Sequence, residues 1–179
     1  MIEKGIKIPS QNILFIRHLL TAVNVQREFY LGSDIKYSSC ICKDWGGLHC
    51  CKVDADYRNG PGKIEINGNF FKKGIVAHAR SVIKFQLDSK YDVFSSCIGI
   101  SKSNTATSVC GISVGDARFR VWGDHVILQN WIVKGSPEDP TCIRVVITDV
   151  NELTLETDLN FSRDCDFSTW VDAKVAKGI

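Results

Sequence analysis

Acid–base chemistry would require the histidines and carboxylates of this 179-residue chain to stand in pairs or beside a nucleophile. The histidines occupy positions 18, 49, 78 and 125, and none shares a short motif with a nucleophile. Glycoside hydrolysis requires two carboxylates that face each other across the scissile bond. The carboxylates are scattered, and only RDCDFSTWVD gathers several, namely Asp164, Asp166 and Asp172. The sequence also lacks the G-x-S-x-G, H-E-x-x-H, P-loop and G-x-G-x-x-G motifs, so we expect no catalytic activity in this chain.

Stacking on the apolar face of a ligand is the second chemistry that the sequence allows, because it contains four tryptophans. Trp45 stands between an aspartate and a Gly-Gly pair in a loop and offers the best exposed platform. Trp131 follows an asparagine at the end of a strand, and either exposure or burial fits it. We expect Trp122 on the outer face or rim of a sheet, whereas Trp170 precedes the alternating VDAKV and fits the core.

Eight cysteines stand at positions 40, 42, 50, 51, 97, 110, 142 and 165. An even count suits a protein in an oxidising, extracellular compartment. We expect Cys97 to pair with Cys110, Cys142 with Cys165, and the first four cysteines among themselves. Zinc is the alternative, because CICKDWGGLHCC offers four thiols and His49 within twelve residues. This segment lacks the C-x2-C knuckles of structural zinc sites, so disulfides are the better prediction.

Loops that gather several carboxylates can bind calcium, a hard cation that prefers oxygen ligands. The segments DVNE, RDCD and KVDADY qualify, the last with Asp54 and Asp56, but none has the spacing of an EF-hand. A structural calcium ion is therefore an open option, and the sequence indicates no other cofactor.

The charge balance restricts the class of partner. Twenty-two basic and twenty acidic residues give a net charge of +2, which is not the basic excess expected for nucleic-acid or anionic-membrane binding. We therefore expect a neutral or small-molecule partner. No apolar run approaches the roughly 20 residues of a membrane span. The segment NILFIRHLLTAV, residues 12–23, resembles the apolar centre of a signal peptide, and a short helix or strand packed on the domain is the alternative.

Short alternating segments dominate the chain from about residue 62 onward. SVIKFQLD places Ile83, Phe85 and Leu87 on one face, and ARFRVWGD points Phe119 and Val121 inward. KIEINGNFFKKG, DVFSSCIGIS, TCIRVVITDV and ELTLETD are similar, and Asn-Gly, Gly-Asp and Pro-containing turns separate these segments. Such spacing predicts an all-β antiparallel sandwich or jelly roll. Only the region near residues 13–28 fits a helix.

Three longer elements carry a more specific signal. The first has the form I-x-G-x-x-F-x-K-G-I-x-x-H-A-x-S and comprises Ile66, Gly68, Phe71, Lys73, Gly74, Ile75, His78, Ala79 and Ser81. The second is F-x-x-x-x-G-I, from Phe94 to Ile100, and the third is W-x-D-A-K, from Trp170 to Lys174. With the segments around them, from about Tyr30 to Val175, they resemble the NPCBM family of carbohydrate-binding modules, which are found beside glycosidases.

The resemblance implies a galactose-binding-like jelly roll that binds sugars through loops at one end and performs no chemistry. On this basis the chain divides into an N-terminal extension, residues 1–29, helical or irregular, and a domain, residues 30–179. We expect a lectin-like module of a secreted or cell-surface protein, and galactose-containing glycans are one option for its ligand. The alternative is a protein-interaction or adhesion domain without a sugar site, which the extra cysteines and the long loop after Ile100 favour.

The expected ligand contacts are Trp45, His78, Arg80, Trp131, Trp170 and Asp172. The resemblance implies that the His-Ala-x-Ser element lies close to the closing Trp-x-Asp. We therefore expect His78 to be buried under the sheet rim and hydrogen-bonded to Asp172. Arg80, beside it and able to face solvent, is the better candidate for a ligand contact. The sequence departs from the family in its loops: YLGSDI has an extra residue, and no histidine precedes Trp170. Sugar specificity resides in such loops, so no particular sugar is predicted.

Overall fold

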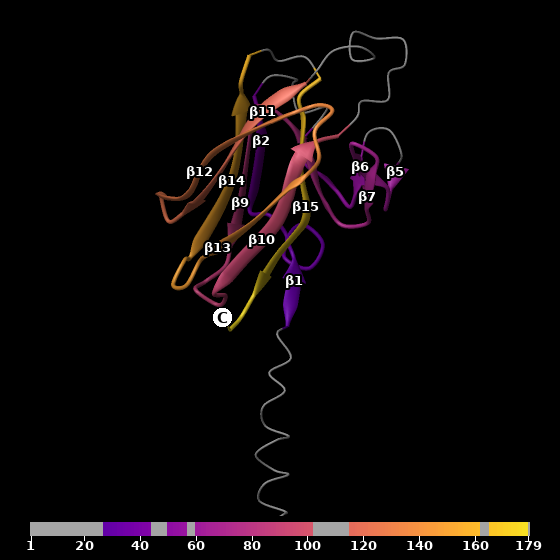
Figure 1. Ribbon diagram of the computed structural model, residues 1–179. Coiled ribbons are helices and arrows are strands. Elements are labelled where there is room, and N and C mark those ends of the chain that lie inside the picture. Colours follow the sequence, from indigo (N-terminus) through magenta and orange to yellow (C-terminus); the bar gives the residue numbers. More distant parts are fainter. Residues whose placement is uncertain (1–26, 44–49, 57–59, 102–114, 162–164, 179) are drawn as a thin grey trace, which may run out of the picture.

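The chain forms a sandwich of two antiparallel sheets in this computed structural model, which describes residues 27–43, 50–56, 60–101, 115–161 and 165–178 (Figure 1). The six-stranded sheet has the order β13-β10-β15-β8-β3, with β1 also paired to β15. Its strands are β1 (Glu28–Tyr30), β3 (Lys52–Val53), β8 (Gly74–His78), β10 (Val93–Ile100), β13 (Thr141–Val146) and β15 (Phe167–Ala176). The predicted all-β antiparallel sandwich is confirmed.

The five-stranded sheet has the order β12-β11-β14-β9-β2. Its strands are β2 (Ser39–Cys42), β9 (Ser81–Gln86), β11 (Asp116–Gly123), β12 (Val126–Gly135) and β14 (Glu152–Leu159). Two short ribbons complete the described strands, β4 (Ala55–Asp56) with β5 (Gly60–Pro61), and β6 (Ile64–Ile66) with β7 (Asn69–Phe71).

The main core lies between the two sheets because their strands alternate apolar and polar residues. Ile83, Phe85 and Phe119 are almost completely buried, as the period-two pattern predicted. Trp170 of β15 occupies this core with 0% exposure, and its ring centroid lies 5.2 Å from that of Phe119 and 6.4 Å from that of Phe94. Burial of each such side chain stabilises the fold by roughly 1.5–3 kcal/mol.

A second apolar cluster covers part of the outer face of the six-stranded sheet. Its buried members are Ile64, Ile66, Val76, Phe167 and Val171. Two of them belong to the β6–β7 hairpin, which lies beside the sandwich in Figure 1. The hairpin turns at Asn67 and Gly68, whose φ angles of 46° and 82° are those that a two-residue Asn-Gly turn requires. The turn predicted from the sequence is therefore present, and the hairpin that it forms covers part of one outer face of the sandwich.

The described chain enters and leaves the sandwich at the same end. β1 pairs antiparallel with β15, and Glu28 lies opposite Ala176. The opposite end, where β8, β12 and β14 finish and β11 begins, is called the loop end below. Most of the region expected to be helical, residues 13–26, lies outside the described residues, and β1 starts two residues before the domain boundary predicted at residue 30. Within the described ranges no helix is long and apolar enough to cross a membrane.

Two disulfides link β2 to the two residues that precede β3. Cys40 pairs with Cys51, and Cys42 pairs with Cys50, so the prediction that the first four cysteines pair among themselves is confirmed. The sulfur atoms that would serve as zinc ligands are thus bonded to each other, and the structure favours the disulfide alternative over zinc.

The other predicted pairings are wrong, because Cys97 forms a disulfide with Cys142 rather than with Cys110. Sheet register explains the difference: Cys97 of β10 lies directly opposite Cys142 of β13. Cys142 therefore cannot pair with Cys165 as expected. Sequence spacing does not reveal that β13 becomes the neighbour of β10.

Candidate functional site

Three strands bring charged side chains together at the loop end. β8 passes into β9 through Ala79 and Arg80, which are joined by a cis peptide bond. β14 ends at Leu159, directly opposite Ala117 near the start of β11. Arg80 lies in the turn between two strands and is exposed, whereas its neighbour Ala79 is buried in the core. The turn therefore presents one cationic side chain to solvent at this end of the sandwich.

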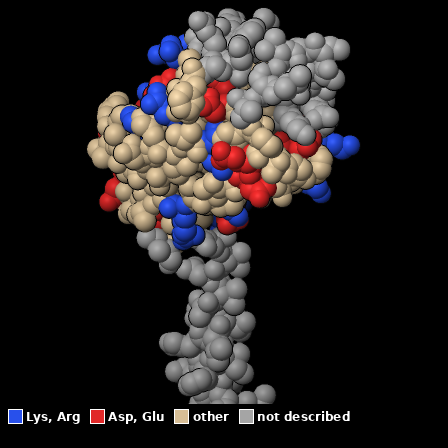
Figure 2. Space-filling model, turned by 45° about the horizontal axis from the view of Figure 1, so that its top comes forward, with Lys and Arg blue, Asp and Glu red and all other residues tan. Residues whose placement is uncertain are grey.

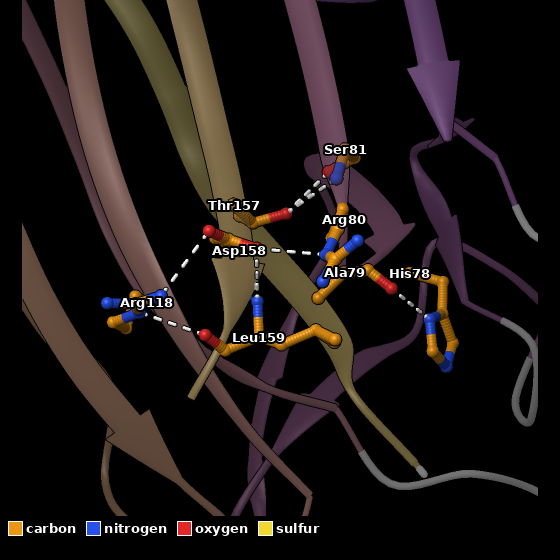
Figure 3. A network of polar contacts seen from close by, with 8 residues as sticks. All are labelled: His78, Ala79, Arg80, Ser81, Arg118, Thr157, Asp158 and Leu159. Carbon is orange, nitrogen blue, oxygen red and sulfur yellow. Dashed lines mark hydrogen bonds and ion pairs between the residues drawn. The ribbon is translucent and has the colours of Figure 1, made fainter. Parts of the chain in front are cut away.

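Asp158 is the centre of the charged group (Figure 3). Arg80 Nε lies 3.2 Å from Asp158 Oδ1, and Arg118 Nη2 donates a hydrogen bond to Asp158 Oδ2 at 3.3 Å. Arg118 Nε also donates to the Leu159 carbonyl oxygen at 2.9 Å. Figure 3 shows the two guanidinium groups on opposite sides of the carboxylate. The side chains of Arg80 and Asp158 are 50% and 33% exposed, so a ligand can reach this ion-pair group from solvent.

Buried hydroxyl groups support the backbone next to Arg80. Ser81 Oγ and Thr157 Oγ1 lie 2.6 Å apart, and Thr157 Oγ1 lies 3.1 Å from Ser168 Oγ. Ser81 and Thr157 belong to the five-stranded sheet, whereas Ser168 belongs to β15 of the six-stranded sheet. Leaving one such buried group unpaired costs about 1–3 kcal/mol. The hydroxyl groups thus join the two sheets and fix the position of the turn that carries Arg80.

A second polar group lies at the start of β11. Asp116 accepts hydrogen bonds from Asn160 Nδ2 at 2.6 Å and from the Phe161 backbone N–H at 3.3 Å. The Asp116 backbone N–H donates to Asp166 Oδ1 at 2.7 Å. These bonds hold the backbone of Phe161, while its side chain is 91% exposed. An aromatic face is therefore available to a ligand two residues beyond Leu159.

His78 is buried and does not join the ion-pair group. Its exposure is 2%, its ring packs edge-on against Phe167 at a centroid distance of 5.3 Å, and Nδ1 hydrogen-bonds the Ala79 carbonyl oxygen. The predicted burial is thus present, but the predicted bond to Asp172 is wrong. His78 lies opposite Phe167 in the β8–β15 register, and Asp172 lies five residues further along β15, roughly 16 Å away.

Trp170 and Asp172, both expected to contact a ligand, lie away from the loop-end group. Trp170 is enclosed by the core and presents no surface to solvent. Asp172 lies beside the Cys97–Cys142 disulfide, where a shallow depression of the six-stranded sheet includes all three residues. Burial raises the pKa of Asp172, and Lys174 opposes this increase. The structure therefore separates both residues from Arg80, because strand β15 carries them away from the loop end.

Trp131 is half-buried on the outer face of the five-stranded sheet. The guanidinium carbon of Arg120 lies 3.8 Å from its ring centroid, and that of Arg118 lies 5.3 Å from it. Because Arg118 also binds Asp158, Trp131 is connected to the loop-end group through one side chain. Trp45 lies outside the described residues, in a segment whose ends the Cys42–Cys50 disulfide holds together.

Sequence reasoning missed Arg118, Asp158 and Phe161 as site residues. A signal existed for the first two, because alternation in ARFRVWGD and ELTLETD places both side chains on an outer face near a strand end. The contact itself depends on the pairing of β11 with β14, which sets Arg118 opposite Asp158. Neither segment reveals this pairing alone, and no pattern in the sequence distinguishes Phe161.

Figure 2 shows residues of both charges on the face that it draws. The one group of three metal-ligating side chains in the described ranges is Cys40, Cys42 and Cys50, which are disulfide-bonded. Within these ranges no three carboxylates come together, and structural calcium stays the open option that the sequence left.

The two antiparallel sheets and the polar loop end define a β-sandwich module, a fold that solved carbohydrate-binding modules share. The CBM51-2 and INT domains from Clostridium perfringens ZmpB, solved in complex with GlcNAc, match with a TM-score of 0.69 and 22% identity, over 84% of this chain and 32% of that chain. CBM51 from Clostridium perfringens GH95, in complex with methyl-galactose, matches with a TM-score of 0.67 and 22% identity, over 83% and 99% of the two chains.

The tandem CBM51 modules of a family 98 glycoside hydrolase from Streptococcus pneumoniae match with a TM-score of 0.67 and 18% identity, over 98% of this chain and 52% of that chain. The chain spans about a third of the length of the ZmpB structure. The comparison with curated proteins gave no match. Residues 33–176 match the model of the NPCBM/NEW2 domain, so the chain belongs to this family, as the sequence resemblance predicted.

Proposed function

We propose that this module binds a glycan at its loop end and performs no catalysis. The observation that carries the proposal is the Arg80–Asp158–Arg118 group, in which fixed donors flank an accessible carboxylate. Neighbouring hydroxyl groups of a sugar both donate and accept hydrogen bonds, so they match a site that offers both functions. Hydrogen bonds to charged groups contribute roughly 1.5–3 kcal/mol each, more than those between neutral groups.

Aromatic surface next to the charged group supports the same ligand class. Phe161 is 91% exposed and its backbone is bound to Asp116, so its ring is held near the ends of β11 and β14. The apolar face of a sugar ring can stack on such a platform. Trp45 is a second proposed platform, because the Cys42–Cys50 disulfide holds the ends of its segment beside β9, which pairs with β2. His78 then acts as structural support for Arg80 rather than as a ligand contact.

Hexoses and N-acetylhexosamines are the proposed ligand class. Two structures with this fold were solved with GlcNAc and with methyl-galactose, which supports this choice. A few hydrogen bonds and one aromatic face give weak affinity for a single sugar, with a Kd on the order of millimolar to high micromolar. Tight attachment to a glycan surface then requires several sites or a larger parent protein.

An oxidising location fits the disulfides. The described residues contain Cys40–Cys51, Cys42–Cys50 and Cys97–Cys142, and such bonds persist outside the cytosol. We therefore place the module in a secreted or cell-surface protein. Mass spectrometry of the native protein with and without alkylation tests this location, because free thiols would remove the disulfide argument for it.

We also propose that the domain starts at Glu28, since β1 belongs to the six-stranded sheet.

Calorimetric titration with methyl-galactose and with GlcNAc tests the proposal directly. Arg80→Ala removes one side of the ion-pair group, and we expect at least about a tenfold loss of affinity, or about 1.4 kcal/mol. Arg144→Ala is the matched control, because Arg144 is an exposed arginine on β13 of the other sheet. Binding of neither sugar at millimolar concentration, or an equal loss in both variants, would contradict the proposal.

A protein-interaction or adhesion domain is the second candidate. Apolar side chains along the edge strand β12 favour it, since Val126 and Val133 are 62% and 50% exposed. Edge strands with exposed apolar residues can pair with another chain. A glycan array without any bound glycan, together with a defined protein recovered with the wild type but not with a Val126→Lys/Val133→Lys variant, would establish this candidate over the first.

A further inference from the structure

Trp122 projects from the outer face of the five-stranded sheet and is not part of the loop-end group. Arg118, Arg120 and Trp122 alternate with buried residues along β11, so they share one face of the sheet. Strand pairing sets Trp122 opposite Thr154 of β14, and Thr154 opposite Lys84 of β9. Four residues separate Trp122 from Arg118, so this row of side chains lies roughly 13 Å from the ion-pair group.

The same row forms one wall of a depression of about 260 Å³ in the sheet face. The lining residues are Val82, Lys84, Trp122, His125, Thr154 and Glu156. Val82 and the indole of Trp122 supply apolar surface, while Lys84, Thr154 and Glu156 supply donors and acceptors around it. An aromatic platform with a few convergent polar groups is the usual composition of a small-molecule site.

The charged side chains of the depression already have partners. Trp122 Nε1 donates to Glu156 Oε2 at 2.6 Å, and Lys84 Nζ lies 2.7 Å from Glu152 Oε1. The lining contains one lysine and one glutamate, so these two side chains together give no net charge that would select an ionic ligand. A neutral ligand with many hydroxyl groups can instead add hydrogen bonds to Glu156 and Lys84, because a carboxylate accepts and an ammonium donates more than one bond. The depression therefore suits a polyhydroxylated, uncharged ring.

Stacking holds Trp122 in position before any ligand arrives. The Arg120 guanidinium carbon lies 5.1 Å from the Trp122 ring centroid and 3.8 Å from that of Trp131. Such cation–π contacts hold an aromatic ring in a fixed position. Trp131 belongs to β12, on the opposite side of β11 from β14, so the stack supports Trp122 from one side and the depression opens on the other. A fixed indole loses little freedom when a ligand stacks on it.

We infer that this depression is a second sugar site, which takes a neutral hexopyranose unit on Trp122. Glu156, Lys84 and Thr154 hydrogen-bond the hydroxyl groups of the sugar. The choice of ligand class rests on the proposed function, but the position of the site does not, because Arg80, Arg118 and Asp158 do not line the depression.

Nuclear magnetic resonance of the 15N-labelled protein tests the inference with methyl-galactose and GlcNAc as probes. The chain has four indole N–H groups, and Trp122→Phe identifies the signal of Trp122 by its loss. We expect this signal to shift in a saturable way, because its N–H binds Glu156 at the rim of the depression. The signal of Trp170, at 0% exposure, serves as the internal control, and the backbone amide of Leu159 reports on the loop end.

Two variants separate this site from the loop end. Arg80→Ala should weaken the Leu159 titration at least about tenfold and leave the Trp122 titration within twofold of the wild type. Thr154→Val keeps the shape of the side chain but removes its hydroxyl, and it should weaken the Trp122 titration at least about threefold without changing that of Leu159. A Leu159 shift with a stationary Trp122 signal overturns the second site and leaves the proposed function intact. If neither signal moves, both are overturned.

Discussion

The two outer faces of the sandwich differ in what covers them. The β6–β7 hairpin lies on the six-stranded sheet and buries Ile66 in one cluster with Phe167, whereas the five-stranded sheet carries a row of half-buried charged and aromatic side chains along β11. His78 and Arg80 are two residues apart, yet His78 packs on Phe167 and Arg80 binds Asp158. The comparison predicts that burial, and not residue type, separates structural positions such as His78 from proposed ligand contacts such as Arg80.

The largest effect should come from the covered sheet and its disulfide. Cys97→Ala/Cys142→Ala removes a cross-link between residues 45 apart, and we expect the free energy of unfolding to fall by about 4 kcal/mol. Cys42→Ala/Cys50→Ala opens a link of only 8 residues at the loop end, and about 2–3 kcal/mol should be lost. Urea unfolding measures both, and equal losses would contradict the ranking.

Truncation of the hairpin should also destabilise the fold strongly. Ile66 has 0% exposure, so Ile66→Ala leaves a cavity in the second cluster and should cost about 3 kcal/mol. Val133→Ala on the uncovered sheet is the control, because a side chain that is 50% exposed should change the free energy of unfolding by no more than about 0.5 kcal/mol. A cost below about 1 kcal/mol for Ile66→Ala would mean that the hairpin does not close this face.

Variants of His78 and Arg80 compare a buried residue with an exposed residue two positions further along the chain. His78→Ala should lower the free energy of unfolding by about 1–2 kcal/mol, because it removes a buried ring and its hydrogen bond to the Ala79 carbonyl oxygen. Its sugar affinity should stay within twofold of the wild type. Arg80→Ala should instead lower the sugar affinity and leave the free energy of unfolding nearly unchanged. Calorimetry and urea unfolding on the same preparations test this pair, and a tenfold affinity loss in a fully stable His78→Ala variant would reverse the assignment.

The smallest effect concerns Asp172 and depends on pH. Burial raises the pKa of Asp172, so the folded state holds this proton more tightly than the unfolded state. Protonated Asp172 therefore stabilises the fold fully at pH values below its pKa in the unfolded state. This stabilisation is lost as the pH rises through the higher pKa of Asp172 in the folded state. Asp172→Asn tolerates the φ of 47° and should raise the free energy of unfolding at pH 7 by up to about 0.5 kcal/mol. Near pH 3 the variant and the wild type should unfold alike.

Local patterns in the sequence predict most of the strands. Alternation in SVIKFQLD and ARFRVWGD places the buried Phe85 and Phe119 correctly, and the Asn67-Gly68 turn is where its residue types require it. These features depend on neighbours within a few residues. The strand order, in contrast, depends on residues that are far apart in the sequence. The predicted pairing of Cys97 was wrong for this reason, since its partner on β13 stands 45 residues away.

The candidate site was predictable only in part. Arg80 was predicted as a ligand contact from its place in the His-Ala-x-Ser element, where it can face solvent. The structure shows it exposed in the turn. Asp158 and Arg118 depend on the register of β11 against β14, which no single segment contains. The family resemblance implied that His78 lies close to Asp172, whereas the β8–β15 register pairs His78 with Phe167, five residues before Asp172.

The antiparallel neighbours β1 and β15 place both ends of the described chain opposite the loop end (Figure 1). A biotin or fluorophore coupled beyond Ala176 would therefore face away from the ligand. A protein captured on a sensor chip through this position should present Arg80 and Phe161 to the solution, and its measured affinity should equal that of the untethered protein. The pairing of β1 with β15 would thus orient the proposed glycan site toward the solution.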